Sequence, residues 1–305
     1  MDIVRKRLQE RPYLVLDGAM GTQLIEAGLE PGACPEAWNV SHPKRLREIH
    51  QAYARAGADI LLTNSFGGSP FRLKPHGFED RVFELNRAAA QIAKEVAADE
   101  ETSSPSGTGG AVPILVGGSM GPSGQMMEPL GELTAADARE GFLIQASGLV
   151  AGGVDLIWIE TMSDPAEAVA AIEGARRASD LPIGLTMTFD AGGRTMMGTT
   201  PEQVLDLVAR FDLVALGANC GNGPGEIESV VRALAELDSG IPIVAKSNAG
   251  IPTWMDGKLV YDGTPEVMAG HAQRVRSLGA QLIGGCCGTT PAHIRAMGES
   301  LAGPT

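Results

Sequence analysis

The sequence predicts a single (β/α)8 TIM barrel that takes up the whole chain, residues 1–305. Three observations support this fold. Apolar, β-branched runs alternate with longer segments of helical period from one end of the chain to the other. Eight of each fit into 305 residues, which is a normal size for one such barrel. The strand-like runs are apolar almost throughout, as expected for strands that are covered on both faces. A doubly wound open sheet alternates strands and helices in the same way and is the second fold considered.

Each expected strand is a short apolar run that stops at a polar residue or a glycine. The eight runs are Tyr13–Asp17, Asp59–Thr63, Pro113–Gly118, Asp155–Glu160, Ile183–Phe189, Leu213–Asn219, Ile241–Lys246 and Gln281–Gly285. The expected helices follow these runs, over residues 43–56, 80–99, 134–151, 164–178, 201–210, 225–238, 264–278 and 290–301. Thr134, Thr200, Thr264 and Thr290 are expected N-caps, the last three directly before a proline that suits the first turn. The Ser- and Gly-rich stretch Asp99–Gly110 is expected to be a solvated loop before the third strand.

Composition narrows the class of protein. The formal net charge is -13 and there is no basic block, which argues against nucleic acid and anionic membranes as partners. No apolar run reaches transmembrane length, and the first residues lack the apolar region of a signal peptide. Four cysteines in a chain of this size do not form a disulfide framework. We therefore expect a soluble cytoplasmic protein with reduced thiols.

Polar residues follow the expected strands at the end where barrel enzymes build their active sites. In chain order, these residues are Asp17, Asn64, Ser119, Glu160, Thr188 and Asp190 on either side of Phe189, Asn219 with Cys220, Lys246, and Cys286 with Cys287. Three cysteines and two carboxylates should therefore meet on one rim of the barrel.

The three cysteines at the strand ends predict a zinc site. Cys286 and Cys287 are adjacent between glycines, which allow the backbone to leave the alternating pattern of a strand. Three protein ligands and one open position are typical of catalytic zinc. Three thiolates make zinc a poor Lewis acid for water, but a thiol bound to it is deprotonated, which suits alkyl transfer to sulfur. Buried free cysteines and a Cys286–Cys287 disulfide remain alternatives at this point, and Cys34 is expected to be an incidental thiol.

Asp17 and Glu160 have two interpretations. They can bind the ammonium group of a substrate, while the backbone N–H groups of Gly18–Thr22 bind its carboxylate. Alternatively, Asp17 opens a turn and Glu160 caps the next helix. Lys246 is considered as a Schiff-base lysine, but no phosphate-binding glycine loop accompanies it. The methionines at strand ends (Met20, Met120, Met162 and Met187) are expected to be packing residues or to line an apolar channel. The five histidines fall in loops or helices, so a histidine-based site has little support.

These residues together resemble the homocysteine S-methyltransferase family over essentially the whole chain. The motifs are Asp17-Gly18-Ala19-Met20-Gly21-Thr22, Thr63-Asn64-Ser65-Phe66, Gly121-Pro122, Glu160-Thr161-Met162, Asn219-Cys220 and Gly284-Gly285-Cys286-Cys287-Gly288-Thr289-Thr290. The resemblance implies the barrel, Zn²⁺ on Cys220, Cys286 and Cys287, and homocysteine held by the loop after strand one and by Glu160. The expected substrate contacts are Asp17, Gly18, Ala19, Met20, Thr22, Asn64, Phe66, Ser119, Glu160 and Asn219.

The methyl donor is a separate question. The lack of a cobalamin or folate module in the sequence suggests a small onium donor such as betaine, S-methylmethionine or dimethylsulfoniopropionate. A cationic donor needs aromatic faces, and Trp38, Phe189 and Trp254 are the candidates beside Phe66. Pro35–Trp38 resembles the betaine-type enzymes, although Gly67 stands where animal betaine-type enzymes carry a zinc-binding tyrosine.

Other segments resemble the homocysteine module of cobalamin-dependent methionine synthase, namely Gly121–Gly124, Pro129–Thr134 and Asn248–Pro252. The alternative function is therefore the homocysteine-binding subunit of a split methionine synthase, which takes its methyl group from methylcobalamin on a separate corrinoid protein. A third reading is a zinc- or thiol-binding subunit that catalyses nothing alone. The sequence leaves homo-oligomers open.

Overall fold

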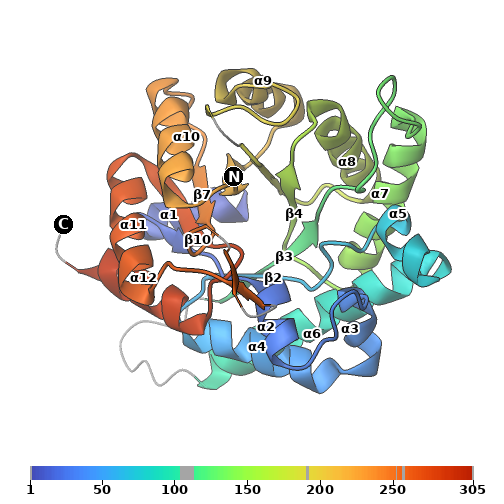
Figure 1. Cartoon of the computed structure of the whole chain (residues 1–305), viewed down its shortest axis with the longest axis horizontal. Coiled ribbons are helices and arrows are strands. Elements are labelled where there is room, and N and C mark those ends of the chain that lie inside the picture. Colours follow the sequence, from blue (N-terminus) through green and yellow to red (C-terminus); the bar gives the residue numbers. More distant parts are fainter. Residues whose placement is uncertain (1, 104–112, 190–191, 252, 256–257, 304–305) are drawn as a thin grey trace.

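A computed structural model describes residues 2–103, 113–189, 192–251, 253–255 and 258–303 of the chain. Strands occupy its middle and helices surround them (Figure 1). No helix in the described ranges is both long and apolar enough to cross a membrane.

Eight parallel strands form the central sheet, and they are the eight that the sequence predicts. They are β1 (Leu14–Val15), β2 (Ile60–Leu62), β3 (Leu115–Met120), β4 (Leu156–Met162), β5 (Ile183–Met187), β6 (Ala215–Cys220), β7 (Ile243–Ser247) and β10 (Ala280–Gly285). Their order is β1-β10-β7-β6-β5-β4-β3-β2. A parallel bridge between Leu16 and Ile60 joins the two edge strands and closes the ring. The fold is thus a (β/α)8 barrel, and the open sheet is the wrong alternative.

The eight expected helices also form. They are α4 (Pro43–Arg55), α6 (Val82–Ser103), α7 (Ala135–Ala151), α8 (Pro165–Ala178), α9 (Pro201–Phe211), α10 (Pro224–Glu236), α11 (Pro265–Ser277) and α12 (Pro291–Ala302). The hydroxyls of Thr134, Thr200 and Thr264 each accept a backbone N–H in the first turn, as the caps predict. Helix α6 is longer than expected, so the beginning of the stretch predicted as a loop, up to Ser103, is helical. Residues 104–110 of that stretch lie outside the described part.

The sequence patterns miss the shorter elements. These are α1 (Ile3–Glu10), α2 (Met20–Glu26), α3 (Trp38–Ser41), α5 (Pro70–Leu73), the 3-10 turns η1 (Pro35–Ala37), η2 (Lys74–His76) and η3 (Glu79–Arg81), and the antiparallel pair β8 (Thr253–Met255) and β9 (Lys258–Val260). All but α1 lie in loops that follow strands, and most are too short to show a clear helical or strand period.

Two apolar layers stabilise the barrel. Side chains that point inward, such as Leu14, Leu62 and Trp158, form an inner cluster, which Val4 of α1 joins. Their neighbours in the strands point outward and pack against the helices in a larger cluster. Helix α1 precedes β1 and packs into the inner cluster, so it closes the N-terminal end of the barrel. The opposite end, where the strands stop, carries the polar residues.

Candidate metal centre and active site

Three cysteine sulfurs meet at the C-terminal end of the barrel. Cys220 ends β6, and Cys286 and Cys287 follow β10, with β7 between these two strands. The Sγ atom of Cys220 lies 2.9 Å from that of Cys286 and 3.9 Å from that of Cys287. All three sulfurs lie within 4.8 Å of one another. Tetrahedral zinc with Zn–S bonds of about 2.3 Å needs sulfurs roughly 3.8 Å apart. The cluster therefore fits one such ion.

The protonation of the cluster is shared among its members. Hydrogen bonds with the Cys286 and Cys287 side chains raise the pKa of Cys220 well above its usual value. Hydrogen bonds from Cys220 and Cys286, together with one from Tyr261, lower the pKa of Cys287 to about 3 despite its burial. One sulfur is then a thiolate that the other two solvate, and metal binding would release protons from the thiols. All four cysteines are free, so the alternative of a Cys286–Cys287 disulfide is not the arrangement found.

Asn219 holds the backbone around the cluster. Its neighbour Cys220 has a φ of 59°. Thr161, at the end of β4 two strands away, has a φ of 63°. Both values lie in the left-handed region that non-glycine residues rarely adopt. The Asn219 side chain accepts the N–H of Thr161 at 2.8 Å and the hydroxyl of Thr186 at 2.7 Å, and it donates to the Thr161 hydroxyl at 2.7 Å. Asn219 is fully buried and is not among the residues that line the cavity described next. Its side chain thus ties the end of β6, where Cys220 lies, to Thr161, and its contact with substrate stays a prediction.

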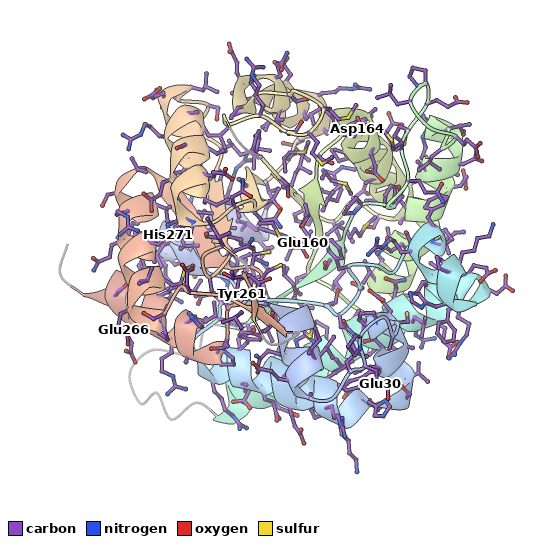
Figure 2. The ribbon with its side chains drawn as sticks, viewed as in Figure 1. Glu30, Glu160, Asp164, Tyr261, Glu266 and His271 are labelled. Carbon is purple, nitrogen blue, oxygen red and sulfur yellow. The ribbon has the colours of Figure 1, made fainter. Side chains whose placement is uncertain are left out.

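A cavity of about 640 Å3 opens beside the sulfurs. It brings together most of the expected substrate residues: Asp17, Gly18, Ala19, Met20, Thr22, Asn64, Phe66, Ser119 and Glu160, with Cys220, Cys286 and Cys287. Glu160 and Tyr261 lie over the middle of the ring of strands, while Glu30, Asp164 and Glu266 lie toward its periphery (Figure 2). The site that the strand ends predict is thus a single cavity.

Gly18 shows why this rim needs glycine. A Cβ atom at Gly18 would lie 2.7 Å from the Thr289 hydroxyl and 2.9 Å from the Tyr53 ring. The Tyr53 hydroxyl in turn donates to the carbonyls of Ala19 and Thr289, at 3.1 and 3.2 Å. These contacts fasten the loop after β1 to the loop that carries the paired cysteines.

Two carboxylates and one lysine form the polar floor of the cavity. Asp17 Oδ2 accepts the N–H of Leu62 at 2.7 Å, whereas its buried Oδ1 has no hydrogen-bond partner. Glu160 Oε1 accepts the Ser119 hydroxyl at 2.5 Å. The Lys246 Nζ atom lies 3.7 Å from Asp17 Oδ1 and 3.6 Å from Glu160 Oε2. We call Asp17, Glu160 and Lys246 the charged pocket.

The charges in this pocket depend on one another. Burial raises the pKa of Asp17 to about 7, although Lys246 and the N–H of Leu62 work in the opposite direction. Burial also opposes the charged form of Lys246, but Glu160 and Asp17 outweigh it and raise the pKa of its ammonium above the usual value. A Schiff-base lysine must lose its proton, so this environment argues against that role for Lys246.

Of the aromatic residues predicted for the donor site, some line the cavity in the structure and others do not. Trp38 is buried and stacks on His42, with ring centroids 4.6 Å apart. Phe189 is buried in the outer core, and neither residue lines the cavity. The Trp254 side chain lies outside the described part. Phe66 lines the cavity as expected, and Phe71 of α5 joins it.

Several cavity residues have no signal in the sequence. Phe71, Arg72 and Gln125 come from a short helix and a loop whose residues show no period. Of the methionines at strand ends, Met20 lines the cavity, and Met120, Met162 and Met187 are buried in the outer core. The expectation of packing methionines is therefore confirmed for these three.

The comparison with known proteins agrees with this site. The family model described as homocysteine S-methyltransferase matches residues 14–301. The chain belongs to this family. The resemblance noted in the sequence is thereby confirmed.

Two curated relatives are named methionine synthase. The protein from Mycobacterium tuberculosis is 34% identical over 99% of this chain, and the one from Mycobacterium leprae is 33% identical over 95%. The chain spans about a quarter of the length of these relatives, 25% and 24%. They are therefore much larger proteins that contain a segment similar to this barrel.

Among solved structures, the homocysteine methyltransferase MmuM from Escherichia coli matches along the full chain. Its oxidised form has a TM-score of 0.81 and 26% identity over 97% of this chain and 98% of that one. Its metallated form has the same TM-score and identity over 96% and 98%. A methyltransferase from Methanosarcina mazei, with a TM-score of 0.55 and 11% identity, shares the fold alone.

Proposed function

We propose that the chain is a zinc-dependent homocysteine S-methyltransferase, in which Cys220, Cys286 and Cys287 hold the ion. The observation that carries the proposal is the set of three sulfurs within 4.8 Å of one another at the wall of the cavity. Bound zinc would supply one open position at which a thiol loses its proton near neutral pH. The metallated form of the MmuM enzyme supports a metal in this family. A reducing compartment such as the cytoplasm would keep the three thiols available for the ion.

The residues around the sulfurs would orient homocysteine. Its ammonium group would lie against Asp17 Oδ1, which has no hydrogen-bond partner, and against Glu160, and its carboxylate would meet the loop Gly18–Thr22. The side chain would then extend toward the cysteines on the same wall. Asn64 and Ser119 also line this region, and Ser119 fixes one oxygen of Glu160. The chain thus recognises both ends of an α-amino thiol.

The reaction is a displacement at the methyl carbon. The homocysteine thiol gives its proton to solvent when it binds, and the thiolate sulfur then forms a bond to the methyl carbon. The bond from that carbon to the donor nitrogen or sulfur breaks, and the donor leaves as a neutral amine or thioether while methionine forms. The methyl group needs no general base. The enzyme contributes alignment of the two reactants and exclusion of water from the cavity.

For the donor, we propose a small onium compound that also carries a carboxylate, as betaine, S-methylmethionine and dimethylsulfoniopropionate do. Phe66 and Phe71 offer aromatic faces to a methylated cation in the outer part of the cavity. Arg72 lines the same part and suits the carboxylate. A cavity of about 640 Å3 has room for both small molecules.

A separate corrinoid protein is the second candidate donor, and two observations favour it. The curated relatives are methionine synthases that match along nearly the whole chain. Exposed apolar side chains also lie on the loops at the active-site end, namely Met126, Leu130, Met196 and Ile251. Such a rim is suited to a protein that covers the cavity while it delivers the methyl group.

One assay separates these possibilities. The zinc-loaded protein is incubated with homocysteine and, in separate reactions, with betaine, S-methylmethionine, dimethylsulfoniopropionate, free methylcobalamin, or methylcobalamin on a corrinoid-binding protein. Methionine formed with a small onium donor supports the first proposal, and methionine formed only with the corrinoid protein selects the second. Homocysteine binding with proton release but no turnover with any donor would instead indicate a thiol-binding subunit. Turnover by metal-free protein would overturn the zinc proposal.

A further inference from the structure

The position of Lys246 sets it apart from an ordinary buried lysine. Its side chain is 4% exposed, and it reaches from β7 into the cavity that holds the cysteines. Its Nζ atom lies 3.6–3.7 Å from one oxygen of Glu160 and one of Asp17. A direct hydrogen bond between an ammonium and a carboxylate is shorter, at about 2.7–2.9 Å. Lys246 thus balances charge in the pocket without using up the hydrogen-bonding capacity of these oxygens.

The two oxygens that face Lys246 are not the ones that accept the hydrogen bonds from Leu62 and Ser119, and Asp17 Oδ1 has no hydrogen-bond partner among the described residues. Asp17 uses Oδ2 for the N–H of Leu62, and Glu160 uses Oε1 for the Ser119 hydroxyl. The remaining oxygens, Oδ1 and Oε2, converge on the lysine from β1 and β4. Two buried carboxylates this close to each other repel, and a cation between them keeps both oxygens directed to one point.

The charge of the pocket follows from these three groups. When Asp17 and Glu160 are both ionised, two carboxylates and one ammonium leave one negative charge, which one substrate ammonium would neutralise. Without the lysine, the pocket would have two negative charges or would take up a proton. With the lysine and only one carboxylate, the pocket would be neutral and would not attract an ammonium group.

We propose that Lys246 determines the specificity of the homocysteine site by neutralising one of the two carboxylates, so that the pocket accepts a thiol with one ammonium group. This inference rests on the proposed function, because it assumes that Asp17 and Glu160 receive the ammonium of homocysteine. It gives the lysine a role in recognition and none in the chemical step.

The test is a charge-restoring pair of substitutions, measured by binding calorimetry on zinc-loaded protein. The two ligands are homocysteine and 4-mercaptobutanoate, which has the same thiol and carboxylate but no ammonium. We expect Asp17→Asn, which leaves a neutral pocket, to reduce the preference for homocysteine about tenfold or more, since a hydrogen bond between charged groups is worth roughly that factor. Adding Lys246→Met restores one negative charge through Glu160. The preference is the ratio of the affinities for homocysteine and 4-mercaptobutanoate, and the double variant D17N/K246M should recover at least half of the lost preference when this ratio is plotted as a logarithm.

The matched control is D17N/K246R, which keeps the positive charge and should stay as poor as Asp17→Asn alone. Metal content and thermal unfolding are measured for each variant, so that only folded, loaded proteins are compared. If K246M lowers the preference of Asp17→Asn further, or if K246M and K246R act alike, Lys246 is a packing residue and the inference is wrong. If the wild-type protein itself does not bind homocysteine, the proposed function fails instead.

Discussion

Asn219 on β6 and Thr161 on β4 are joined by two hydrogen bonds that span the intervening strand β5. The amide oxygen of Asn219 accepts the Thr161 N–H at 2.8 Å, and its amide nitrogen donates to the Thr161 hydroxyl at 2.7 Å. Both Thr161 and Cys220 have positive φ, which is unfavourable for these residues. This pair of hydrogen bonds therefore couples a cysteine of the cluster to the strand that carries Glu160.

Replacing Asn219 with Ala should weaken the metal site without removing a ligand. The variant leaves a buried N–H and two hydroxyls without their partner, which costs about 2–4 kcal/mol of stability. Because outer hydrogen bonds orient metal ligands, zinc affinity should fall about 10- to 100-fold. Competition with a chelator measures the affinity, and denaturant unfolding measures the stability. Asn222→Ala, in the exposed turn after Cys220, is the control and should keep wild-type zinc affinity. Equal zinc affinity in both variants would contradict the role of Asn219.

The cysteine cluster predicts a sharp difference between two thiols of this chain. Cys286→Ala removes one of three ligands, so the purified protein should retain little zinc and form no methionine. Cys34→Ala removes a buried cysteine whose thiol contacts Glu36 and which lies outside the cluster. Its zinc content should stay near one ion per chain. Metal analysis of both proteins after dialysis measures the zinc content. Full zinc retention by Cys286→Ala would contradict the prediction that Cys286 is a zinc ligand.

Asp17 predicts a pH dependence of stability. Burial raises its pKa from 3.8 to about 7, so the folded protein binds this proton more tightly than the unfolded chain does. The resulting stabilisation is fully present below about pH 4 and is lost as the pH rises through about 7. Each pKa unit corresponds to about 1.4 kcal/mol, so metal-free wild-type protein should lose ~2–4 kcal/mol relative to Asp17→Asn between pH 4 and pH 8.

Unfolding in denaturant at several pH values, with thiols kept reduced, measures this difference. The comparison with Asp17→Asn removes the contributions of titrating groups that lie far from Asp17, because both proteins share them. Parallel stability curves for the two proteins would show that Asp17 is ionised in the folded protein over the whole range.

The aromatic residues predict a donor effect at Phe66 and none at Trp38. Phe66 is 37% exposed and lines the cavity, so Phe66→Leu should raise the KM of an onium donor about fivefold or more through loss of the aromatic face. The KM of homocysteine should change less than about twofold, because its ammonium and carboxylate groups are proposed to meet Asp17, Glu160 and the loop Gly18–Thr22, and Phe66 offers neither a charge nor a hydrogen bond. Trp38→Phe, in the stack with His42, should affect stability and leave the donor KM near that of the wild type. A larger donor effect at Trp38 would restore it as the donor-binding residue.

Local patterns predict most of the fold. All eight strands and all eight main helices lie where the apolar runs, helical periods and Thr-Pro caps place them, because each is long enough to show its own period. The closure of the barrel follows from their number and alternation. The short helices α2 and α5 and the pair β8 and β9 are missed, because elements of a few residues depend on the surfaces to which they dock.

Some of the site residues can also be predicted from the sequence, whereas others are placed only by the structure. The adjacent cysteines between glycines and the Asn-Cys end of β6 predict a cysteine cluster from the sequence, and the structure brings the three sulfurs together. Trp38 and Phe66 are both aromatic residues in loops, so the sequence alone does not separate them. In the structure Trp38 stacks on His42, whereas Phe66 lines the cavity. The direction of a loop side chain depends on what covers the loop, and a single sequence does not contain that information.

The sequence by itself determined the barrel, the three cysteines and the chemistry of a thiol acceptor, since these depend on residue types at strand ends that any closed barrel brings to one rim. Only the tertiary structure decided the partners of Lys246, which come from β1 and β4, more than 80 residues away on either side of a closed ring. Closing the ring buries these three groups together, and burial strengthens the interactions between their charges.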